Sequence, residues 1–226
     1  MLRSILVFLV ALAFSACAEP DAPSEAATPI PTTTTADTSA VTAEMAASQA
    51  LGEGDIAPDF ALPGVDGETV QLAALLERGP VVLTFYRGSW CPYCNTQLRD
   101  YQQALGSFEA TGARLVAISP QAPDSSMSMA ERNALAYSVL SDTGGQGSQQ
   151  YGLVFRVDAE TRARYEAVGI DLARYNGGDT DAAWALPVPA TYVIDPSGII
   201  RAAFVEADYT QRASPRQVLE ALQEVV

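Results

Sequence analysis

The sequence predicts an α/β domain in which helices flank a central mixed sheet. Two apolar runs rich in β-branched and aromatic residues, at 81–86 and 115–118, are typical of buried strands. A helical pattern lies between them, and this order is typical of a parallel strand–helix–strand unit. Further along, apolar runs at 191–194 and 199–204 flank an Asp-Pro-Ser-Gly turn, which indicates an antiparallel hairpin. Parallel and antiparallel pairs in one domain predict a mixed sheet.

The strand–helix–strand unit contains the clearest helical pattern. Apolar side chains recur there at steps of three and four residues and form one stripe, namely Leu98, Tyr101, Leu105 and Phe108. Gly112 would end this helix. Before the unit, runs at 60–62 and 69–72 flank an Asp-Gly turn, so we expect an N-terminal β-hairpin extension.

Shorter patterns predict the remaining elements. We expect a helix that Asp124 caps and that runs to position 136, followed by a short strand at 139–140. Helical structure is expected at 159–168. An amphipathic helix at 215–225 closes the domain.

The composition excludes several classes of enzyme. The chain of 226 residues contains no histidine, and all 13 of its basic residues are arginine. It therefore cannot build a catalytic site that uses histidine as a base, or a metal site that uses histidine as a ligand. We expect no metal and no other cofactor. The net charge of −14 also argues against nucleic acid as a partner, because phosphate binding needs concentrated positive charge.

The first 17 residues are typical of a targeting segment. Arg3 precedes an apolar run at 4–14 that is too short to span a bilayer, and small residues then lead to Cys17. This pattern resembles a bacterial lipobox, whose cysteine is lipidated and becomes the mature N-terminus. Cleavage after Ala18 is the alternative. We expect residues 1–17 to be a lipoprotein-type signal peptide. The protein would then lie on the periplasmic side of the bacterial cell envelope, anchored to the membrane through lipid on Cys17 or secreted into the periplasm.

The next segment, residues 18–50, is predicted to be a disordered tether. It is rich in Ala, Thr and Pro and has no aromatic residue, so it cannot bury enough apolar surface to fold. A random coil of this length reaches roughly 30 Å on average. A short helix at 43–51 is left open. The folded domain is expected to span residues 51–226.

Two cysteines carry the predicted chemistry. Cys91 and Cys94 lie where the strand at 81–86 passes into a helix, and they are the only thiols left once Cys17 carries lipid. Free N–H groups and the dipole at a helix start favour a thiolate, so we expect Cys91 to be an exposed nucleophile with a low pKa. Cys94 lies on the same face of the helix, within reach of a disulfide. Arg87 would add positive potential, and Trp90 would shield the sulfurs.

Two other uses of the pair are weaker. A purely structural disulfide across so short a loop would add little stability. A zinc site would need two more ligands, and a chain without histidine or spare cysteines lacks the usual ones.

The sequence around the pair resembles the active site of the thioredoxin superfamily. An apolar strand is followed by the motif Trp90-Cys91-Pro92-Tyr93-Cys94. The resemblance implies a thioredoxin-like fold. It also implies a cis-proline packed against the cysteines. Pro189, which directly precedes the predicted hairpin, occupies the corresponding place, and Pro187 is the competing candidate.

Within that superfamily, the domain is similar to the peroxiredoxin-like branch of the alkyl hydroperoxide reductase/thiol-specific antioxidant family. Four segments carry the likeness, at 57–62, 85–94, 187–195 and 208–212. Three positions depart from it. Thr84 and Gly88 stand where typical peroxiredoxins have proline and threonine. Pro189 stands where they have the arginine that activates the peroxide.

This resemblance implies a thioredoxin-dependent peroxidase that reduces hydrogen peroxide or organic hydroperoxides. Cys91 would attack the hydroperoxide and become a sulfenic acid, which Cys94 would convert into a disulfide. A thioredoxin-like reductant would then reduce that disulfide. The alternative is an envelope thiol–disulfide oxidoreductase that acts on protein disulfides with the same residues. A third hypothesis is a tethered binding module whose disulfide switches its surface.

Overall fold

The computed structural model describes residues 41–178 and 180–225. The predicted signal peptide, Cys17 and most of the predicted tether therefore lie outside the described residues. Within the described part of the chain, no helix combines the length and the apolar character needed to cross a bilayer.

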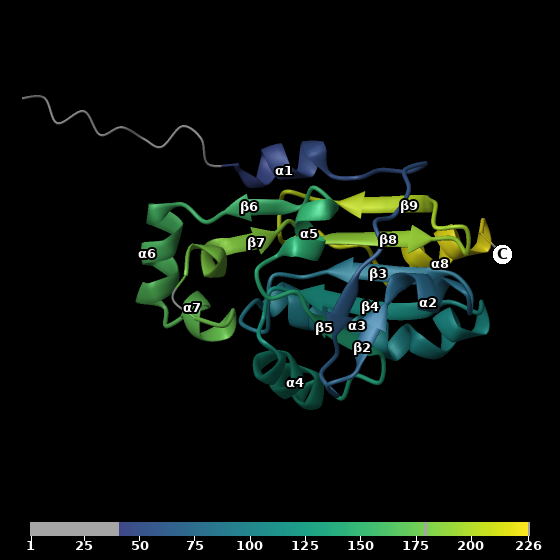
Figure 1. The fold of residues 1–226 in the computed structure, drawn as a ribbon, viewed down its shortest axis with the longest axis horizontal. Helices are drawn as coiled ribbons and strands as arrows, with labels where there is room; N and C mark the ends of the chain where they lie inside the picture. Colours follow the sequence, from purple (N-terminus) through teal and green to yellow (C-terminus); the bar gives the residue numbers. More distant parts are fainter. Residues whose placement is uncertain (1–40, 179, 226) are drawn as a thin grey trace, which may run out of the picture. The chain divides into compact units, whose positions relative to one another are not determined.

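A five-stranded mixed sheet forms the centre of the domain, and it confirms the predicted architecture (Figure 1). The strand order is β5-β4-β3-β8-β9, with parallel pairing of β3 with β4 and β4 with β5, and antiparallel pairing elsewhere. The strands are β3 (Val81–Phe85), β4 (Arg114–Ser119), β5 (Ser138–Ser141), β8 (Ala190–Ile194) and β9 (Ile200–Val205). β3 therefore lies in the middle, between a parallel and an antiparallel neighbour.

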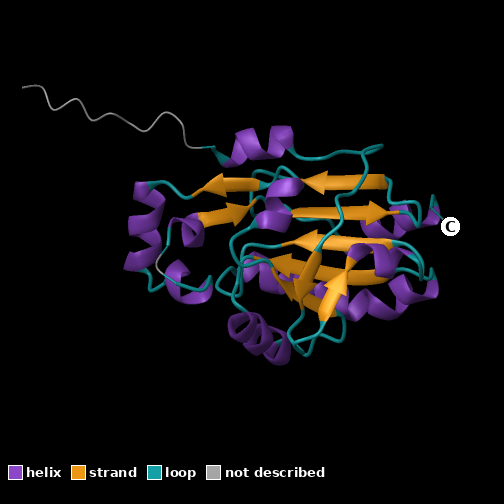
Figure 2. Cartoon of the chain, viewed as in Figure 1, coloured by secondary structure: helices purple, strands orange, loops and turns teal. Residues whose placement is uncertain are grey.

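Both faces of the sheet are covered, which explains why all five residues of β3 are buried. Val81, Leu83 and Phe85 belong to one core, and α1 (Ala43–Gln49) and α2 (Leu72–Leu76) contribute to it. Val82 alternates with them and faces the opposite core, which is built from α3 (Pro92–Ala110) and α8 (Pro215–Gln223) (Figure 2). A strand buried on two sides needs apolar residues at successive positions, as the sequence has them.

Most of the other predicted elements are present. The N-terminal hairpin consists of β1 (Ala61–Pro63) and β2 (Thr69–Gln71), and α6 (Ala159–Ala167) lies where helical structure was expected. α4 (Pro123–Arg132) is shorter than predicted, because Ala134 adopts a φ of 48° and turns the chain away. Asp124 lies in its first turn rather than at the cap, which is Ala122.

A second small sheet was not predicted. β6 (Val154–Arg156) pairs antiparallel with β7 (Ala185–Pro187). Strands of three residues carry too little alternation to be recognised in a sequence. The shortest helices were not predicted either, because four or five residues are too few to show a helical pattern. They are α5 (Gln146–Gln150), α7 (Leu172–Tyr175) and the 3-10 helix Asp181–Trp184.

The folded region begins before the predicted boundary at residue 51. Thr42 caps α1 by accepting a hydrogen bond from the Met45 N–H, and Ala46 in that helix is fully buried in the core. The Leu51 N–H donates to the Tyr151 carbonyl at 3.1 Å. The helix that the sequence left open therefore belongs to the packed domain.

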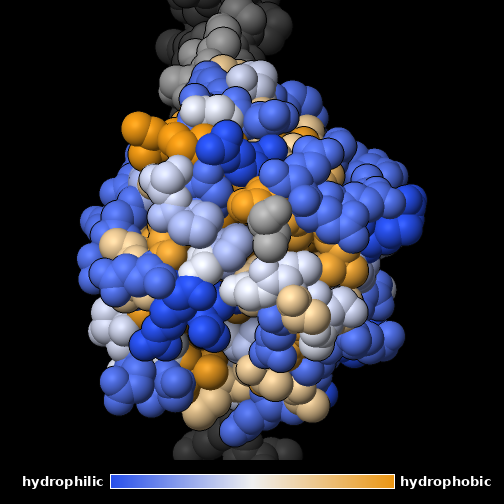
Figure 3. Space-filling view, turned by 90° about the vertical axis from the view of Figure 1, so that its right-hand side faces the viewer, coloured by the Kyte–Doolittle hydropathy of each residue, from blue (hydrophilic) through white to orange (hydrophobic). Residues whose placement is uncertain are grey.

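On the face shown in Figure 3, hydrophilic residues predominate and apolar residues appear as separate spots among them. Single exposed apolar side chains are normal for a globular domain and need no special explanation.

Candidate redox site

The structure places the two cysteines at the junction that the sequence predicted. Cys91 is the N-cap of α3, directly after the loop that follows β3, and Pro92 occupies the first helical position. Both cysteines are free thiols, but they are buried, with 1% of Cys91 and 0% of Cys94 exposed. The expectation of an exposed Cys91 is therefore wrong. The sulfurs belong to a small core that also contains Tyr86 and Leu98.

The loop before Cys91 is held in one conformation. The Ser89 N–H donates to the fully buried Gln121 Oε1 at 2.7 Å, and Gln121 Nε2 donates back to the Ser89 hydroxyl at 3.0 Å. Asn95 Nδ2 donates to the Ser89 carbonyl at 2.7 Å. The Cys91 N–H closes the turn by donating to the carbonyl of Gly88 at 3.1 Å.

Gly88 is required by this loop. Its φ is +147°, a conformation that residues with a side chain rarely adopt, and a Cβ there would lie 2.5 Å from Trp90 Nε1. The indole ring packs directly on the glycine. The threonine that typical peroxiredoxins have at this position could not fit here.

The order of the two cysteine pKa values is opposite to the one expected, because Cys94 and not Cys91 has the lowered pKa. A hydrogen bond to the sulfur of Cys94, together with burial, raises the pKa of Cys91. Burial also acts to raise the pKa of Cys94, but the hydrogen bond from Cys91 and the positive charge of Arg212 outweigh it and lower that pKa to about 6. Arg212 Nη2 lies 3.6 Å from the Cys94 sulfur. The prediction from the helix start considered Cys91 alone and missed both the neighbouring sulfur and this distant arginine.

A buried polar network supports the segment that carries Arg212. The Tyr101 hydroxyl donates to the Ala213 carbonyl at 3.0 Å and also contacts the Thr191 hydroxyl at 3.2 Å. Thr84 lies 3.0 Å from the same Thr191 hydroxyl. Thr84 is thus used to connect β3 to β8, at the position where typical peroxiredoxins have proline.

Arg87 is a buried cation surrounded by aromatic rings. It is 3% exposed, and its guanidinium donates to the Tyr165 hydroxyl. Its Cζ lies 4.8 Å from the ring centre of Trp90 and 4.3 Å from that of Tyr209. No carboxylate of the described residues forms an ion pair with Arg87, and its Nε has no hydrogen-bond partner there. The sequence indicated Arg87 and Trp90, and Tyr209 lies in the segment 208–212 that carries the family likeness. Tyr165 comes from a remote helix without a recognisable motif.

Pro189 lies beside this group, but the predicted cis bond is wrong. None of the described residues follows a cis peptide bond. Pro187, the competing candidate, is a paired residue of β7, and the Val188 N–H donates to the Leu153 carbonyl at 2.8 Å. The small sheet therefore holds the backbone before Pro189 extended, as is usual for a residue that precedes proline.

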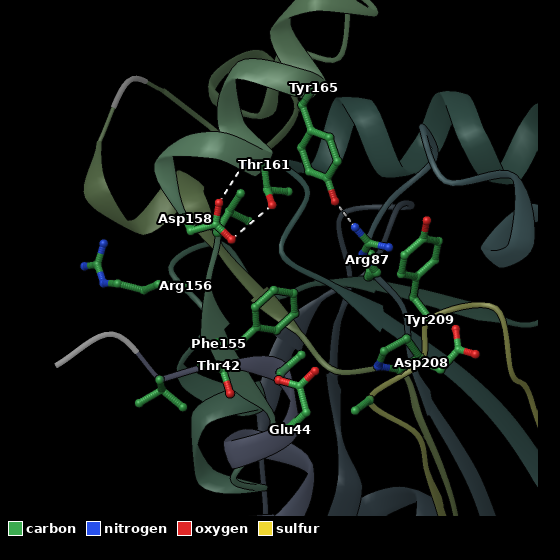
Figure 4. Close-up of a pocket in the computed structure, with 15 residues that line it drawn as sticks. Thr42, Glu44, Arg87, Phe155, Arg156, Asp158, Thr161, Tyr165, Asp208 and Tyr209 are labelled. Atoms are coloured by element: carbon green, nitrogen blue, oxygen red, sulfur yellow. Dashed lines mark hydrogen bonds between the residues drawn. The ribbon is translucent and has the colours of Figure 1, made fainter. Parts of the chain in front are cut away.

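Next to Arg87 and Pro189 there is a cavity of about 540 Å³ (Figure 4). It lies among the start of α1, β6, α6 and the loop after β9, and neither cysteine lines it. No cluster of three or more cysteine or carboxylate side chains that could hold a metal occurs in residues 41–178 and 180–225.

The comparisons with known proteins agree on the type of domain. The AhpC/TSA family model matches residues 54–203. The chain is 32% identical over 103 residues to peroxiredoxin Bcp of Escherichia coli, which covers 46% of this chain and 65% of the relative. It is 26% identical over 154 residues to a chloroplastic peroxiredoxin Q of Suaeda salsa, which covers 68% of this chain and 60% of the relative. The matches thus span 47% to 65% of the length of the curated relatives.

A solved structure shows the same fold. The crystal structure of peroxidoxin BcpB from Mycobacterium tuberculosis superposes with a TM-score of 0.61 at 23% identity, covering 78% of this chain and 99% of that one. This likeness confirms the predicted thioredoxin-like fold.

A matched pair of glycine substitutions tests the loop. We expect Gly88→Ala to destabilise the domain by about 1–3 kcal/mol, because the new methyl displaces Trp90 and strains the backbone. Gly106→Ala, in open space on α3, is expected to stabilise it by about 0.5–1 kcal/mol. Urea unfolding of the reduced protein measures both. Equal effects of the two substitutions would contradict the packing of Trp90 on Gly88.

A second prediction concerns the charge on the sulfurs. Arg212 lowers the pKa of Cys94, so Arg212→Gln should raise it by about one unit, equivalent to about 1.4 kcal/mol. Thiolate absorbance near 240 nm, followed against pH in the reduced protein, measures the midpoint. Arg216→Gln is the control, because Arg216 pairs with Glu220 on the exposed side of α8. An unchanged midpoint in Arg212→Gln would show that Arg212 has no influence on the thiolate.

Proposed function

The chain belongs to the AhpC/TSA family, and from this premise we propose that it is a thiol-dependent peroxidase that reduces hydroperoxides through Cys91 and Cys94. One observation carries the proposal. Two thiols joined by a hydrogen bond lie beside Arg87, a buried cation whose Nε has no hydrogen-bond partner among the described residues. Such donors can stabilise the negative charge that develops on oxygen when a peroxide bond breaks.

In the proposed reaction, the Cys91 sulfur attacks the terminal oxygen of the hydroperoxide. The O–O bond breaks, the electron pair leaves with the second oxygen, and that oxygen takes a proton to become an alcohol or water. Cys91, oxidised by two electrons, is then a sulfenic acid. The Cys94 thiolate then attacks the sulfenic sulfur, which forms the disulfide and expels hydroxide, and the hydroxide takes a proton from solvent to become water.

The two arginines support different steps of this sequence. The positive charge of Arg87, which lies next to Trp90, acts to lower the pKa of Cys91. The hydrogen bond to Cys94 and burial have larger effects and raise it. Arg212 contacts Cys94 and keeps that sulfur ionised near neutral pH. For Cys91 to attack, the shared proton moves along the existing hydrogen bond to Cys94. After the attack, Arg212 favours the thiolate of Cys94 that resolves the sulfenic acid.

A dithiol protein of the thioredoxin type is the proposed reductant. It would exchange with the Cys91–Cys94 disulfide and carry the two electrons needed to restore both thiols. Tyr93 within the motif is 44% exposed and packs edge-to-face on Tyr209, which is 46% exposed. Exposed aromatic side chains next to the redox pair suit a transient protein contact.

A protein-disulfide oxidoreductase is the second candidate, favoured by the intact Cys-x-x-Cys motif. Its substrate is a disulfide on another polypeptide, which must approach the nucleophilic sulfur directly. Both sulfurs here are at most 1% exposed. A hydroperoxide needs a much smaller opening than a polypeptide, so burial favours the peroxidase.

The decisive test is the first oxidation product. With hydrogen peroxide, we expect the Cys94→Ser variant to accumulate a sulfenic acid on Cys91, and the wild type to form the Cys91–Cys94 disulfide. Dimedone labelling and mass spectrometry identify the two products. The wild-type rate should exceed that of a free thiolate by at least about a thousandfold, or about 4 kcal/mol of transition-state stabilisation.

Arg87→Ala provides the matched comparison. This variant should slow sulfenic-acid formation more than it slows exchange with a small disulfide, because only the first reaction develops charge on a peroxide oxygen. The peroxidase proposal fails if the wild type reacts with peroxide no faster than a free thiolate of equal pKa. Rapid reduction of insulin disulfides would then support the oxidoreductase.

We also propose that the protein is held at the periplasmic side of the bacterial envelope by lipid on Cys17. The supporting observation is the run of small residues that precedes Cys17 in the sequence. In cells, the wild type should partition with membranes, and Cys17→Ser should release a soluble form or block processing. A soluble wild type whose mature chain starts at Glu19 would exclude the anchor.

A further inference from the structure

We propose that the cavity beside Arg87 is a binding site for a small zwitterion, an amino acid with an apolar side chain. Its carboxylate would lie on Arg87, its side chain against the apolar lining and its ammonium group toward the acidic residues of the cavity. The inference goes beyond the proposed peroxidase and needs no contact with the sulfurs, since neither cysteine lines this cavity.

A buried cation at one side of the cavity lacks an anionic partner. Arg87 lines the cavity, and only 3% of it is exposed. None of the ion pairs between described residues includes it, and its Nε has no hydrogen-bond partner among them. A buried charge is costly unless it is paired and hydrogen-bonded. A ligand carboxylate would supply both the negative charge and an acceptor for the Nε–H.

A hydroxyl beside Arg87 can donate a second hydrogen bond to the same carboxylate. Tyr165 also lines the cavity, and its hydroxyl oxygen accepts from the Arg87 guanidinium (Figure 4). Burial raises the pKa of Tyr165, so the hydroxyl keeps its proton at neutral pH. Because the oxygen already accepts from Arg87, the O–H is the part of the group that can bind a ligand oxygen. Arg87 and Tyr165 together thus provide two donors for the two oxygens of a carboxylate.

The lining of the cavity suits a compact apolar side chain. A volume of about 540 Å³ lies within the range of small-molecule sites, about 300–1,000 Å³. Its apolar surface comes from separate segments, which meet around Phe155 in Figure 4. The main contributors are Val41, Phe155, Val157, Pro189, Ala207 and Tyr209.

Acidic residues around the cavity favour a ligand that also carries a positive charge. Three carboxylates line it, those of Glu44, Asp158 and Asp208. Asp158 is engaged, because both of its oxygens accept hydrogen bonds from Thr161. Hydrogen bonds from backbone N–H groups lower the pKa of Glu44 and of Asp208, so both are anionic at neutral pH. A simple anion would be repelled by these charges, whereas an ammonium group on the same ligand would be attracted.

The second arginine of the cavity is already engaged elsewhere. Arg156 Nη1 donates to the Asp181 carbonyl at 3.3 Å, and its Nη2 lies 4.0 Å from the Asp181 carboxylate. Its side chain extends away from Arg87 (Figure 4). Arg87 is therefore the arginine that we expect to hold the ligand carboxylate, and Arg156 serves as the matched control.

The binding test compares three probes that share one phenylethyl group. Phenylalanine carries both charges, 3-phenylpropionate lacks the ammonium group, and phenethylamine lacks the carboxylate. We expect phenylalanine to bind the reduced wild-type protein at millimolar concentration or below, as measured by ligand-observed NMR. Phenethylamine should bind at least about tenfold more weakly, because it leaves Arg87 without an anion. 3-Phenylpropionate should bind at least about threefold more weakly, because it meets the acidic residues without a positive charge.

Two matched pairs of variants locate the site. Ala207→Phe fills the cavity and should abolish phenylalanine binding, whereas Ala167→Phe, on the exposed side of α6 and outside the cavity, should leave it unchanged. Arg87→Gln should weaken phenylalanine binding by at least about tenfold, and Arg156→Gln by no more than about twofold. If Arg87→Gln does not fold, the pair at positions 207 and 167 decides the matter.

A third pair tests the ammonium group. Glu44→Gln removes one negative charge from the cavity and should reduce the preference for phenylalanine over 3-phenylpropionate by at least about twofold. Glu131→Gln, an exposed position on α4 outside the cavity, is the control and should leave the preference unchanged.

The outcomes are independent of the proposed function, because none of the probes is turned over. The inference is overturned if phenylalanine does not bind, if Ala207→Phe leaves its binding unchanged, or if either singly charged probe binds as tightly as phenylalanine. The peroxidase would stand in each of these cases. If the protein fails to reduce hydroperoxides but binds phenylalanine at this cavity, the peroxidase fails and the zwitterion site stands.

Discussion

A negative charge on a fully buried sulfur is the constraint around which this domain is organised. Removing a thiolate from water disfavours the charged form, and Cys94 has no exposed surface at all. Three groups offset this cost, namely the Cys91 thiol, the Arg212 guanidinium and the backbone N–H of Arg87. Each comes from a different segment of the chain. Strand β3, helix α3 and the loop before α8 must all be in place before the charge is stable.

Because the chain contains no histidine, the positive charges at the redox site stay constant near neutral pH. The positive charges at the site come from arginine, whose guanidinium does not lose its proton in proteins. A site built with histidine would lose its positive charge between about pH 6 and 7. Here the sulfurs themselves are the groups that titrate, and the surrounding field stays constant.

Long patterns were predictable from the sequence, whereas contacts between remote segments were not. The apolar run of β3 and the stripe of α3 placed the cysteines at the correct junction, because each pattern extends over several residues. The pKa order of the two thiols was wrong, because it depends on Arg212, which lies 118 positions after Cys94. Tyr165 was missed for the same reason, since an aromatic residue on a polar helix carries no local signal. The cis bond at Pro189 was wrong because it was inferred from the resemblance alone, and the local sequence carries no signal for either isomer.

The contact between Arg212 and Cys94 also bears on the electron affinity of the pair. Arg212 stabilises the thiolate, which exists only in the reduced protein, and in the disulfide form the guanidinium has lost that anion. Whatever stabilises the reduced form raises the reduction potential, by about 30 mV for each 1.4 kcal/mol in a two-electron couple. The same arginine that holds a charge in the core therefore makes the oxidised protein a better acceptor of electrons, so that an external dithiol can restore it with less driving force of its own.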